Sequence, residues 1–343
     1  MSAPTLSELP PPPPGKTGWP WTEEPPVPAG GAAGPWPRIT LVTPTYNQGR
    51  YIEETIRSIL LQGYPELEYV VFDGGSTDET VEILRRYDRW LSHWASERDR
   101  GQTHAINKGL DRATGEVFNW INSDDQLAPG ALLEVGRAWA RERPDVLVGR
   151  GTTVELSTGR TVHEWAARPP EEPLDFIRPH RVVMSQPSTF LSTRLVREAG
   201  GFREDLHFVM DWEFYLRIKL LRRDALRAAT TGAVLSTALA HEEAKTTRSS
   251  VSFRREAEKI LLDPGAGWTP EERREVDAFL RRLEDEEAIT AALLGGPGGI
   301  LKIARLPFRS PELLRSRFYW GGVRRALLRG LGAGGWSASR TEP

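Results

Sequence analysis

The sequence predicts an α/β fold built on a parallel, doubly wound sheet. Between residues 39 and 121, short β-branched and apolar runs alternate with segments whose apolar residues recur at helical spacing. Strands that alternate with helices form βαβ units, in which the strands pair in parallel. The chain has 343 residues, 39% of them hydrophobic, which is enough for a sizeable buried core.

The first 37 residues precede this pattern and are rich in Pro, Gly and Ala, with an unbroken proline run at 10–14. Such a composition buries too little apolar surface to offset the entropy lost on ordering. We therefore expect residues 1–37 to form a disordered leader.

Strands and helices are expected to alternate in order up to residue 121. The second helix, around residues 81–84, has Ser76 or Thr77 as its expected N-cap. The expected strands are 39–43, 67–72, 91–95 and 117–121, and the other expected helices are 50–61 and 101–110.

Two adjacent carboxylates, Asp124 and Asp125, follow the fourth strand. Ligands of open α/β sheets bind outside the carboxyl ends of the strands. Neighbouring carboxylates repel each other unless a cation or hydrogen-bond donors compensate them. Oxygen ligands suit Mg²⁺ or Mn²⁺, particularly when phosphate oxygens complete the shell. By themselves the two residues also fit a solvated Asp-Asp turn.

A polar loop with two glycines, residues 73–78, follows the second strand and lets a ligand approach the backbone closely. Asp73, at the strand end, is placed to accept a hydrogen bond from a base or a ribose; an ordinary Asp-Gly turn is the alternative. No G-x-G-x-x-G fingerprint follows the first strand, and the sequence has no P-loop motif, so nucleotide binding here requires another architecture.

The second half contains an expected hairpin at 146–165 and two further candidate residues. Asp211 lies in an aromatic and apolar segment, where burial would raise the pKa of its carboxyl group and make it a better base. A helix N-cap is the alternative role for Asp211. His241 follows a β-tending run at 232–240, and a histidine in such a place is by itself more often structural than a ligand.

A helical C-terminal extension is expected over residues 249–330, with amphipathic helices at 253–262 and 270–294. Residues 300–329 carry eight basic side chains against one acidic one, interleaved with apolar residues. This pattern suits peripheral contact with an anionic membrane surface, and equally a helix docked on its own domain. Residues 331–343 are expected to form a flexible tail.

Composition excludes several classes of protein. The net charge of −2 argues against a nucleic-acid partner, and the absence of cysteine excludes disulfides and thiolate metal sites. No run approaches 18 consecutive apolar residues. We expect a cytoplasmic protein, at most peripheral at the inner face of the plasma membrane.

Seven short motifs lie in order between Arg38 and Lys245, at residues 43–47, 73–78, 99–109, 115–125, 186–190, 210–213 and 241–245. Together they resemble those of the family 2 glycosyltransferases, which are inverting enzymes with the GT-A fold. The sequence has Asp124 next to Asp125 where a separated Asp-x-Asp is common in the family. The resemblance implies a GT-A domain over 38–248, with a Rossmann-like, mixed but mostly parallel sheet flanked by helices.

The resemblance also implies an activity. A sugar would pass from a nucleotide-diphosphate donor of the UDP, dTDP or GDP type to a hydroxyl of a glycan or lipid-linked acceptor, in synthesis of a cell-surface polysaccharide or glycolipid. Asp211 would be the catalytic base, and Asp125 and His241 would contact Mg²⁺ or Mn²⁺. The implied nucleotide contacts are Thr43, Pro44, Tyr46, Asp73 and Asp124, and the implied donor or acceptor contacts are Gln186, Ser188, Trp212, Glu213 and Lys245.

Three other functions stay open at this point: a non-catalytic scaffold that binds a sugar or nucleotide, a sugar nucleotidyltransferase, and a glycosidase. A scaffold has no need of a general base such as Asp211. A nucleotidyltransferase would need a basic activating loop at the carboxyl end of the first strand, where Arg50 is the only basic residue.

Overall fold

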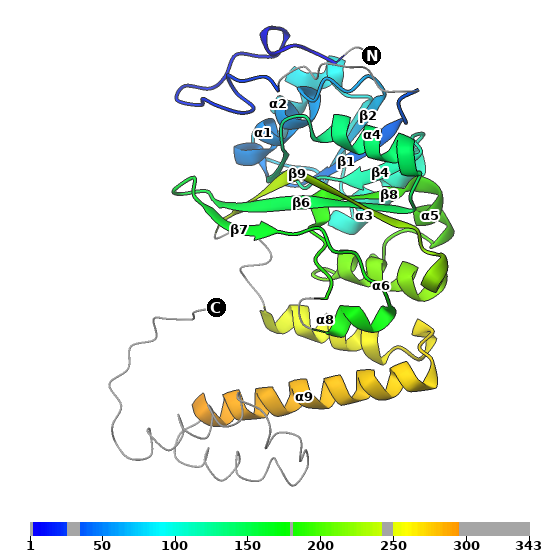
Figure 1. Cartoon of the computed structure of the whole chain (residues 1–343). Coiled ribbons are helices and arrows are strands. Elements are labelled where there is room, and N and C mark those ends of the chain that lie inside the picture. Colours follow the sequence, from blue (N-terminus) through cyan, green and yellow to red (C-terminus); the bar gives the residue numbers. More distant parts are fainter. Residues whose placement is uncertain (1–2, 26–34, 179–180, 242–249, 295–343) are drawn as a thin grey trace. The chain divides into compact units, whose positions relative to one another are not determined.

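The computed structural model describes residues 3–25, 35–178, 181–241 and 250–294, drawn in colour in Figure 1. These residues belong to two compact units, one ending at Gly267 and the other beginning at Trp268. Lys245, the basic segment 300–329 and the tail 331–343 lie outside the described residues.

A sheet of nine strands forms the centre of the first unit, within the described residues. The strand order is β3-β2-β1-β4-β8-β6-β9-β5, and β7 pairs with β6. The strands are β1 (Ile39–Thr45), β2 (Leu67–Asp73), β3 (His93–Ser96), β4 (Val117–Trp120), β5 (Asp125–Leu127), β6 (Val146–Glu155), β7 (Thr161–Trp165), β8 (Thr189–Ser192) and β9 (Ala228–Ala240).

The N-terminal half of the sheet is parallel, as the alternation of strands and helices predicted. Strand β1 pairs in parallel with β2 and β4, and β2 pairs in parallel with β3. Beyond β4 the pairing is mixed, because β8 is antiparallel to both β4 and β6, whereas β6 and β9 run parallel over a long register. The predicted mixed, mostly parallel sheet is confirmed, and so is the hairpin, which is formed by β6 and β7.

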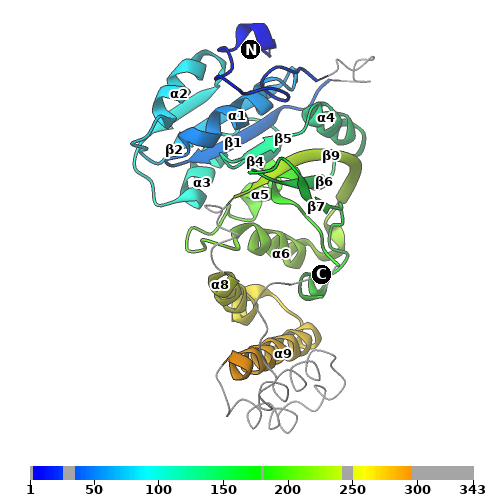
Figure 2. The same ribbon diagram turned by 90° about the vertical axis from the view of Figure 1, so that its left-hand side faces the viewer.

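Helices cover both faces of the sheet (Figures 1 and 2). One face carries α1 (Gly49–Leu60), α2 (Thr80–Tyr87) and α4 (Ala131–Glu142), and the other carries α3 (Gln102–Arg112), α5 (Thr193–Glu198) and α6 (Met210–Arg222). The extension contributes α8 (Ser250–Leu262) to the first unit and α9 (Pro270–Leu294) to the second, so both predicted helices are confirmed. None of the described helices is long and apolar enough to span a bilayer.

A close approach between α3 and β1 depends on Gly109. A Cβ atom at this position would lie 2.4 Å from a methyl carbon of Val42, far inside normal contact distance. Glycine therefore lets α3 pack directly on β1, which fixes where the first turn of α3 meets the end of the sheet.

The prediction of a disordered leader is wrong for residues 3–25, which pack against α1 as an N-terminal strap (dark blue in Figure 2). Trp21 and Leu9 are buried, at 3% and 6% exposure. The composition rule failed because a few large apolar side chains, together with the buried Arg57 of α1, anchor this proline-rich segment. Residues 26–34 lie outside the described part of the chain.

The predicted N-cap of the second helix is also wrong. Helix α2 begins at Thr80, whose amide donates to Asp78 Oδ1 at 3.0 Å. Ser76 and Thr77 instead hydrogen-bond to the loop that follows β1, through Asn47.

Candidate active site

Strands β1, β2 and β4 are parallel and end at the same edge of the sheet, and their carboxyl ends carry the polar residues of the candidate site. Thr45 and Asp73 are register partners at the ends of β1 and β2. Strand β4 continues into Asn122, Asp124 and Asp125. This is the edge at which open α/β sheets bind their ligands.

Asp73 organises the loop that follows β2. Its buried carboxylate accepts hydrogen bonds from Gly75 N at 3.2 Å, Ser76 N at 2.9 Å and Ser96 Oγ at 2.6 Å, and a fourth from Ser76 Oγ. Four donors match the roughly four acceptor positions of a carboxylate. A direct bond from Asp73 to a base would displace one of them, and this contact stays a prediction.

Asn47 ties the loop after β1 to the loop after β2. Its backbone has a φ of 51°, a left-handed conformation that asparagine tolerates better than most residues. Asn47 N donates to Ser76 Oγ at 2.7 Å, and Asn47 Oδ1 accepts from Thr77 N at 2.9 Å. The two loops therefore form one connected rim beside Asp73.

Of the residues expected to line a base pocket beside this rim, only Tyr46 reaches the surface, with 59% exposure. Pro44 is buried, and Thr43 is fully buried with its Oγ1 3.0 Å from Tyr69 Oη. The Thr43 side chain lies inside the sheet because β1 runs two residues further than expected, and its contact with a nucleotide stays a prediction. Thr45 lies at the actual strand end, and its buried Oγ1 has no hydrogen-bond partner among the described residues.

The two carboxylates after β4 differ in environment. The Asp124 side chain is 26% exposed, whereas Asp125 is buried and begins β5. Burial, and next to it the negative charge of Asp124, raises the pKa of Asp125 well above its ordinary value, although Asn122 Nδ2 donates to Asp125 Oδ2 at 3.1 Å. A buried carboxylate beside another is the arrangement that a cation relieves.

These carboxylates fit a divalent cation that is completed by a substrate. Mg²⁺ and similar ions are usually held by one or two carboxylates together with phosphate oxygens, not by a full protein cage. Within the described residues, no group of three or more His, Asp or Glu side chains is placed to hold a metal ion. Asp124 and Asp125 supply the hard oxygen donors that such a shared site requires.

His241, which directly follows β9, contacts this acidic pair through Asp124. Its Nε2 lies 3.1 Å from Asp124 Oδ2. Its ring stacks on Tyr51 of α1, with the centroids 4.7 Å apart and the planes at 28°. The structure thus brings together Asp124, Asp125 and His241, three residues predicted to contact the diphosphate or its metal.

A network of amide side chains continues from the acidic pair. Gln186, in a short 3₁₀ turn, donates to the Trp120 carbonyl at 2.8 Å. Gln102 Nε2 donates to Asn122 Oδ1 at 2.6 Å, and Asn122 in turn donates to Asp125. Gln102 and Asn122 were not among the predicted site residues, although both lie within motifs that carry the family resemblance.

Asp211 is the second residue of α6, so it is not the N-cap, which is Val209. Its Oδ1 accepts from the Trp212 amide at 2.8 Å. Burial raises the pKa of the Asp211 carboxyl group above its ordinary value, and the Trp212 hydrogen bond only partly opposes this. A carboxyl group with a raised pKa is suited to accept a proton from a substrate hydroxyl.

The first turn of α3 connects Asp211 with the acidic pair. Gln102 contacts Asn122, as described, and the adjacent Thr103 donates to Met210 Sδ at 2.8 Å. Because Met210 precedes Asp211 directly, one turn of helix contacts both the loop of Asp125 and the start of α6.

Two residues predicted to contact the substrate, Ser188 and Glu213, have side chains that lie inside the protein, and their contacts with a substrate stay predictions. Ser188 is fully buried, and its Oγ donates to the Arg150 carbonyl at 2.8 Å and lies 2.5 Å from Ser236 Oγ. Glu213 is 4% exposed and pairs with Arg217 Nε at 2.8 Å.

Two other predicted substrate contacts remain partly accessible. Gln186 and Trp212 are both half-buried, and the Trp212 ring packs edge-on against Phe176 at 6.1 Å. Their contacts with a sugar stay predictions.

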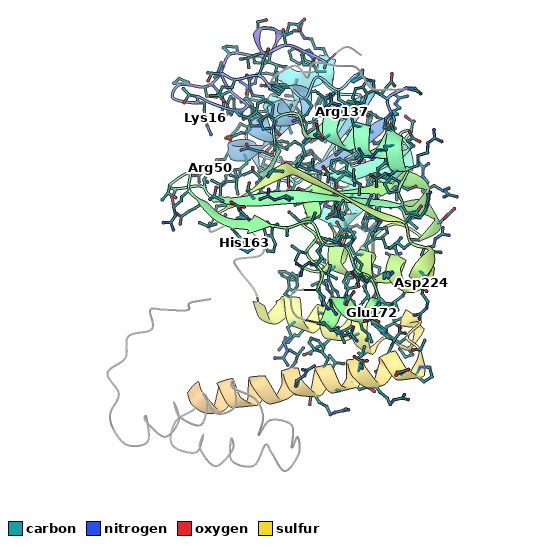
Figure 3. The ribbon with its side chains drawn as sticks, viewed as in Figure 1. Lys16, Arg50, Arg137, His163, Glu172 and Asp224 are labelled. Carbon is teal, nitrogen blue, oxygen red and sulfur yellow. The ribbon has the colours of Figure 1, made fainter. Side chains whose placement is uncertain are left out.

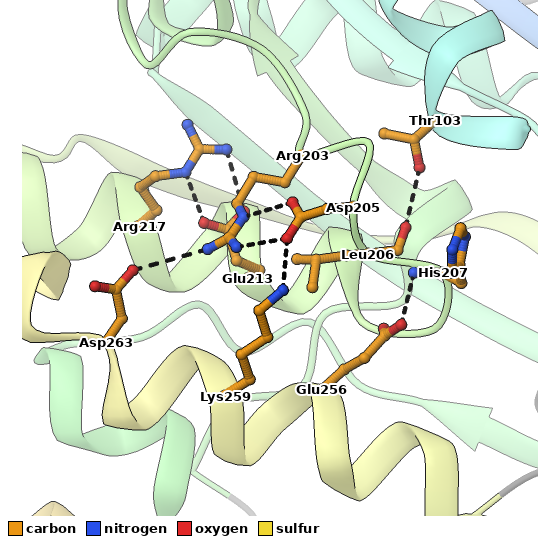
Figure 4. A network of polar contacts seen from close by, with 10 residues as sticks. All are labelled: Thr103, Arg203, Asp205, Leu206, His207, Glu213, Arg217, Glu256, Lys259 and Asp263. Carbon is orange, nitrogen blue, oxygen red and sulfur yellow. Dashed lines mark hydrogen bonds and ion pairs between the residues drawn. The ribbon is translucent and has the colours of Figure 1, made fainter. Parts of the chain in front are cut away.

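Helix α8 supports the segment that leads into α6 (Figure 4). The Glu256 carboxylate accepts from the backbone amides of His207 at 2.9 Å, Phe208 at 2.8 Å and Val209 at 3.2 Å. A negative charge at the start of a helix satisfies free amides and complements the helix dipole. Glu256 therefore fixes the backbone two to four residues ahead of Asp211.

Comparison with known proteins gives consistent results. The model of the family described as Glycosyl transferase family 2 matches residues 40–199. An uncharacterized glycosyltransferase of Mycobacterium tuberculosis is 29% identical over 192 residues, which is 54% of this chain and 70% of that protein. A putative teichuronic acid biosynthesis glycosyltransferase of Bacillus subtilis is 38% identical over 93 residues, which is 26% of this chain and 37% of that protein.

Solved structures share the fold. The TarS 1-349 structure from S. aureus, in complex with UDP-GlcNAc, has a TM-score of 0.61 at 20% identity and covers 86% of this chain and 92% of that one. A mannosyltransferase from Pyrobaculum calidifontis, in complex with GDP-Man and Mn²⁺, has a TM-score of 0.50 at 22% identity, with coverage of 87% and 91%. The motifs, the sheet and these matches together identify a glycosyltransferase family 2 domain in this chain, matched over residues 40–199, with the GT-A fold.

Proposed function

We propose that this glycosyltransferase is metal-dependent and inverting, and that it moves one sugar from a nucleotide-diphosphate donor to an acceptor hydroxyl. The diphosphate would lie at the carboxyl edge of the sheet, beside Asp124, Asp125 and His241. Asp211 would take the proton of the acceptor hydroxyl.

A single observation carries this proposal: one helical turn connects the acidic pair, of which Asp125 is buried, with the base candidate Asp211. Asp125 and Asp211 both have raised pKa values because both are buried. Gln102 and Thr103 contact the segments that hold them, at 2.6 Å from Asn122 and 2.8 Å from Met210. Pairs of carboxyl groups with perturbed pKa values in a connected site are candidates for catalysis.

Sugar transfer requires the acidic pair, Asp124 and Asp125, and the base candidate, Asp211, to have different roles. A divalent ion held by Asp124 and Asp125 would supply charge neutralisation for the leaving diphosphate. Asp211, as the only carboxylate assigned to the acceptor side, would deprotonate the attacking oxygen while the glycosidic bond to phosphate breaks. A single displacement of this kind inverts the anomeric centre, as it does in inverting glycosidases.

The named relatives support the choice of substrates. UDP-GlcNAc occupies the TarS structure, and GDP-Man with Mn²⁺ occupies the mannosyltransferase structure. The Bacillus relative is named for teichuronic acid biosynthesis. We therefore infer a UDP, GDP or dTDP sugar as the donor, and a glycan or lipid-linked acceptor in the synthesis of a cell-surface polysaccharide or glycolipid.

The test is a transfer assay on the full chain with Mn²⁺, an α-linked nucleotide sugar and a panel of glycan and lipid-linked acceptors. Proton NMR of the product should show a β-linkage. The Asp211→Asn variant should lose transfer by roughly 10²- to 10⁴-fold, while its affinity for the nucleotide stays within about twofold of wild type. An α-linked product, or full activity in Asp211→Asn, would contradict the assigned mechanism.

A further inference from the structure

The strap, residues 3–25, is locked to α1 by a buried arginine. Arg57 is fully buried, and its guanidinium donates to the carbonyls of Pro10 at 2.8 Å, Pro20 at 3.1 Å and Trp21 at 3.2 Å. A fourth bond goes to Tyr87 Oη at 3.1 Å. A buried cation that loses its acceptors is strongly unfavourable, so the strap and α1 are ordered together.

Cation–π contacts with Trp21 also stabilise the packing of the strap on α1. Arg57 Cζ lies 4.9 Å from the centroid of the Trp21 ring, and Lys16 Nζ lies 5.4 Å from the same ring on the strap itself. Cation–π contacts of this kind are strongest when the ring and the cation are shielded from water, as they are for Trp21 and Arg57. The strap is thus a fixed part of the first unit.

Two branches lead from the strap to β5, the short strand that begins with Asp125. Trp19 Nε1 donates to the Leu127 carbonyl at 2.9 Å. Lys16, labelled in Figure 3, pairs with Glu54 Oε2 at 2.9 Å, and Glu54 Oε1 accepts from Gln126 Nε2 at 2.6 Å. Both branches therefore end on the two residues that directly follow Asp125.

Strand β5 depends on such external support. It has three residues and lies last in the strand order, and among the described strands it pairs only with β9. Further contacts come from α1, where Thr55 Oγ1 lies 2.7 Å from the Asp125 carbonyl and Ser58 Oγ accepts from Leu127 N at 3.1 Å. A three-residue edge strand has few ladder bonds of its own, so contacts from α1 and the strap determine where Asp125 sits.

We propose that the strap is a positioning element of the donor site: through Trp19 and Lys16 it holds β5, and with it Asp125, in the place required for metal and diphosphate binding. This inference rests on the proposed function of Asp125. Removal of the strap contacts should weaken metal-dependent nucleotide binding while the contacts around Asp211 stay unchanged.

The test uses two conservative variants of the full chain, singly and combined. Trp19→Phe keeps an aromatic ring but removes the N–H donor to Leu127, and Lys16→Met keeps the side-chain length but removes the charge. Lys16→Arg is the rescue variant. Arg137→Met is the matched control, because it removes a cation from an ion pair with Glu134 on α4, a nearby helix.

Two readouts separate positioning from general stability. Hydrogen exchange of metal-free protein should be faster over residues 123–129 in the double variant and unchanged over β6. Calorimetric titration with UDP, GDP and dTDP should give a Mn²⁺-dependent Kd about tenfold weaker than wild type, in the range seen when residues that orient metal ligands are removed. Arg137→Met and Lys16→Arg should bind as wild type does.

The outcomes distinguish this proposal from the proposed function. Wild-type binding with an unchanged Kd in the double variant overturns the strap proposal. If wild type binds none of the nucleotides with Mn²⁺, the assignment of the donor site fails. Hydrogen exchange then tests whether the strap positions β5. Faster exchange confined to residues 123–129 in the double variant supports that role, and unchanged exchange overturns it.

Discussion

Asp124 Oδ2 and His241 Nε2 lie 3.1 Å apart, although the two residues are 117 positions apart in the chain. Asp124 follows β4 and His241 follows β9. Because β9 pairs with β5, the strand that begins at Asp125, the sheet itself carries this histidine to the acidic pair. The contact joins the N-terminal and C-terminal halves of the domain at the point where we place the diphosphate.

Replacement of this histidine should weaken donor binding. In His241→Ala the Asp124 carboxylate loses a partner and the Tyr51 ring loses its stacking neighbour. We expect the Mn²⁺-dependent Kd for the nucleotide diphosphate to rise by roughly 10- to 100-fold. Calorimetry measures it, and wild-type affinity in His241→Ala would exclude His241 from the site.

The rate of transfer should depend on the ionisation of Asp211. The base must be deprotonated, and burial raises the pKa of Asp211. The acid limb of kcat/KM against pH should therefore lie above the usual range of an aspartate, near pH 4 in unfolded peptides. An acid limb at the unperturbed value would contradict a buried base.

The same pKa shift has a defined effect on stability. Between the unfolded pKa of Asp211 and its raised folded pKa, the folded state binds more protons, so stability falls as pH rises through this window. The loss persists above the folded pKa. Asp211→Asn lacks this loss and should be more stable than wild type at neutral pH, as urea denaturation at several pH values would show; equal stability at neutral pH would count against the shift.

Replacement of Glu213 should lower the stability of the fold without changing the affinity for donor or acceptor. Its side chain is 5% exposed and pairs with Arg217, which also donates to the Ala199 and Gly201 carbonyls. Glu213→Gln leaves a partly buried cation without its counter-charge and should lower the free energy of unfolding by about 2 kcal/mol.

A matched control exists on α8. Glu258 and Arg254 have the same i,i+4 spacing but are 31% and 27% exposed. Glu258→Gln should cost at most about 0.5 kcal/mol. Chemical denaturation measures both variants, and a loss of donor or acceptor affinity in Glu213→Gln would support its predicted role in the site.

Glu256 should influence turnover more than donor binding. Glu256→Leu removes the acceptor of three amides just ahead of Asp211, so we expect kcat to fall by about tenfold and stability by about 2 kcal/mol. The donor Kd should not change, because Glu256 has no contact with the acidic pair. Glu258→Leu is the control, because Glu258 lies two residues further along α8 and pairs with Arg254. An unchanged kcat in Glu256→Leu would show that α8 has no part in positioning the base.

Much of the fold follows from local patterns. The strands β1, β2 and β4 are apolar runs that end in polar loops, and the helices between them show apolar residues at helical spacing, so a parallel α/β sheet was predictable. The mixed pairing of β5, β8 and β9 was not, because a strand's partner depends on contacts between segments far apart in sequence. That information came only from the family resemblance.

The motifs located several residues of the candidate site, but they could not show which of the motif side chains are buried. Asp124, Asp125 and His241 meet as expected. Ser188 and Glu213 lie in equally suggestive motifs but are buried, and exposure cannot be deduced from a motif. The strap was missed because composition averages over a segment, whereas a single buried residue, Arg57, organises it.

The central claim is that Asp125 and a divalent ion form the donor site, and a thermal-shift measurement tests it most directly. Purified protein is melted with UDP, GDP, dTDP and their sugar conjugates, with and without Mn²⁺, and alongside Asp125→Ala. We predict a Mn²⁺-dependent rise in Tm for one nucleotide, about 2–4 °C per kcal/mol of binding free energy for a domain of this size, that disappears in Asp125→Ala. The same rise in Asp125→Ala, or no rise with any nucleotide in wild type, would contradict it.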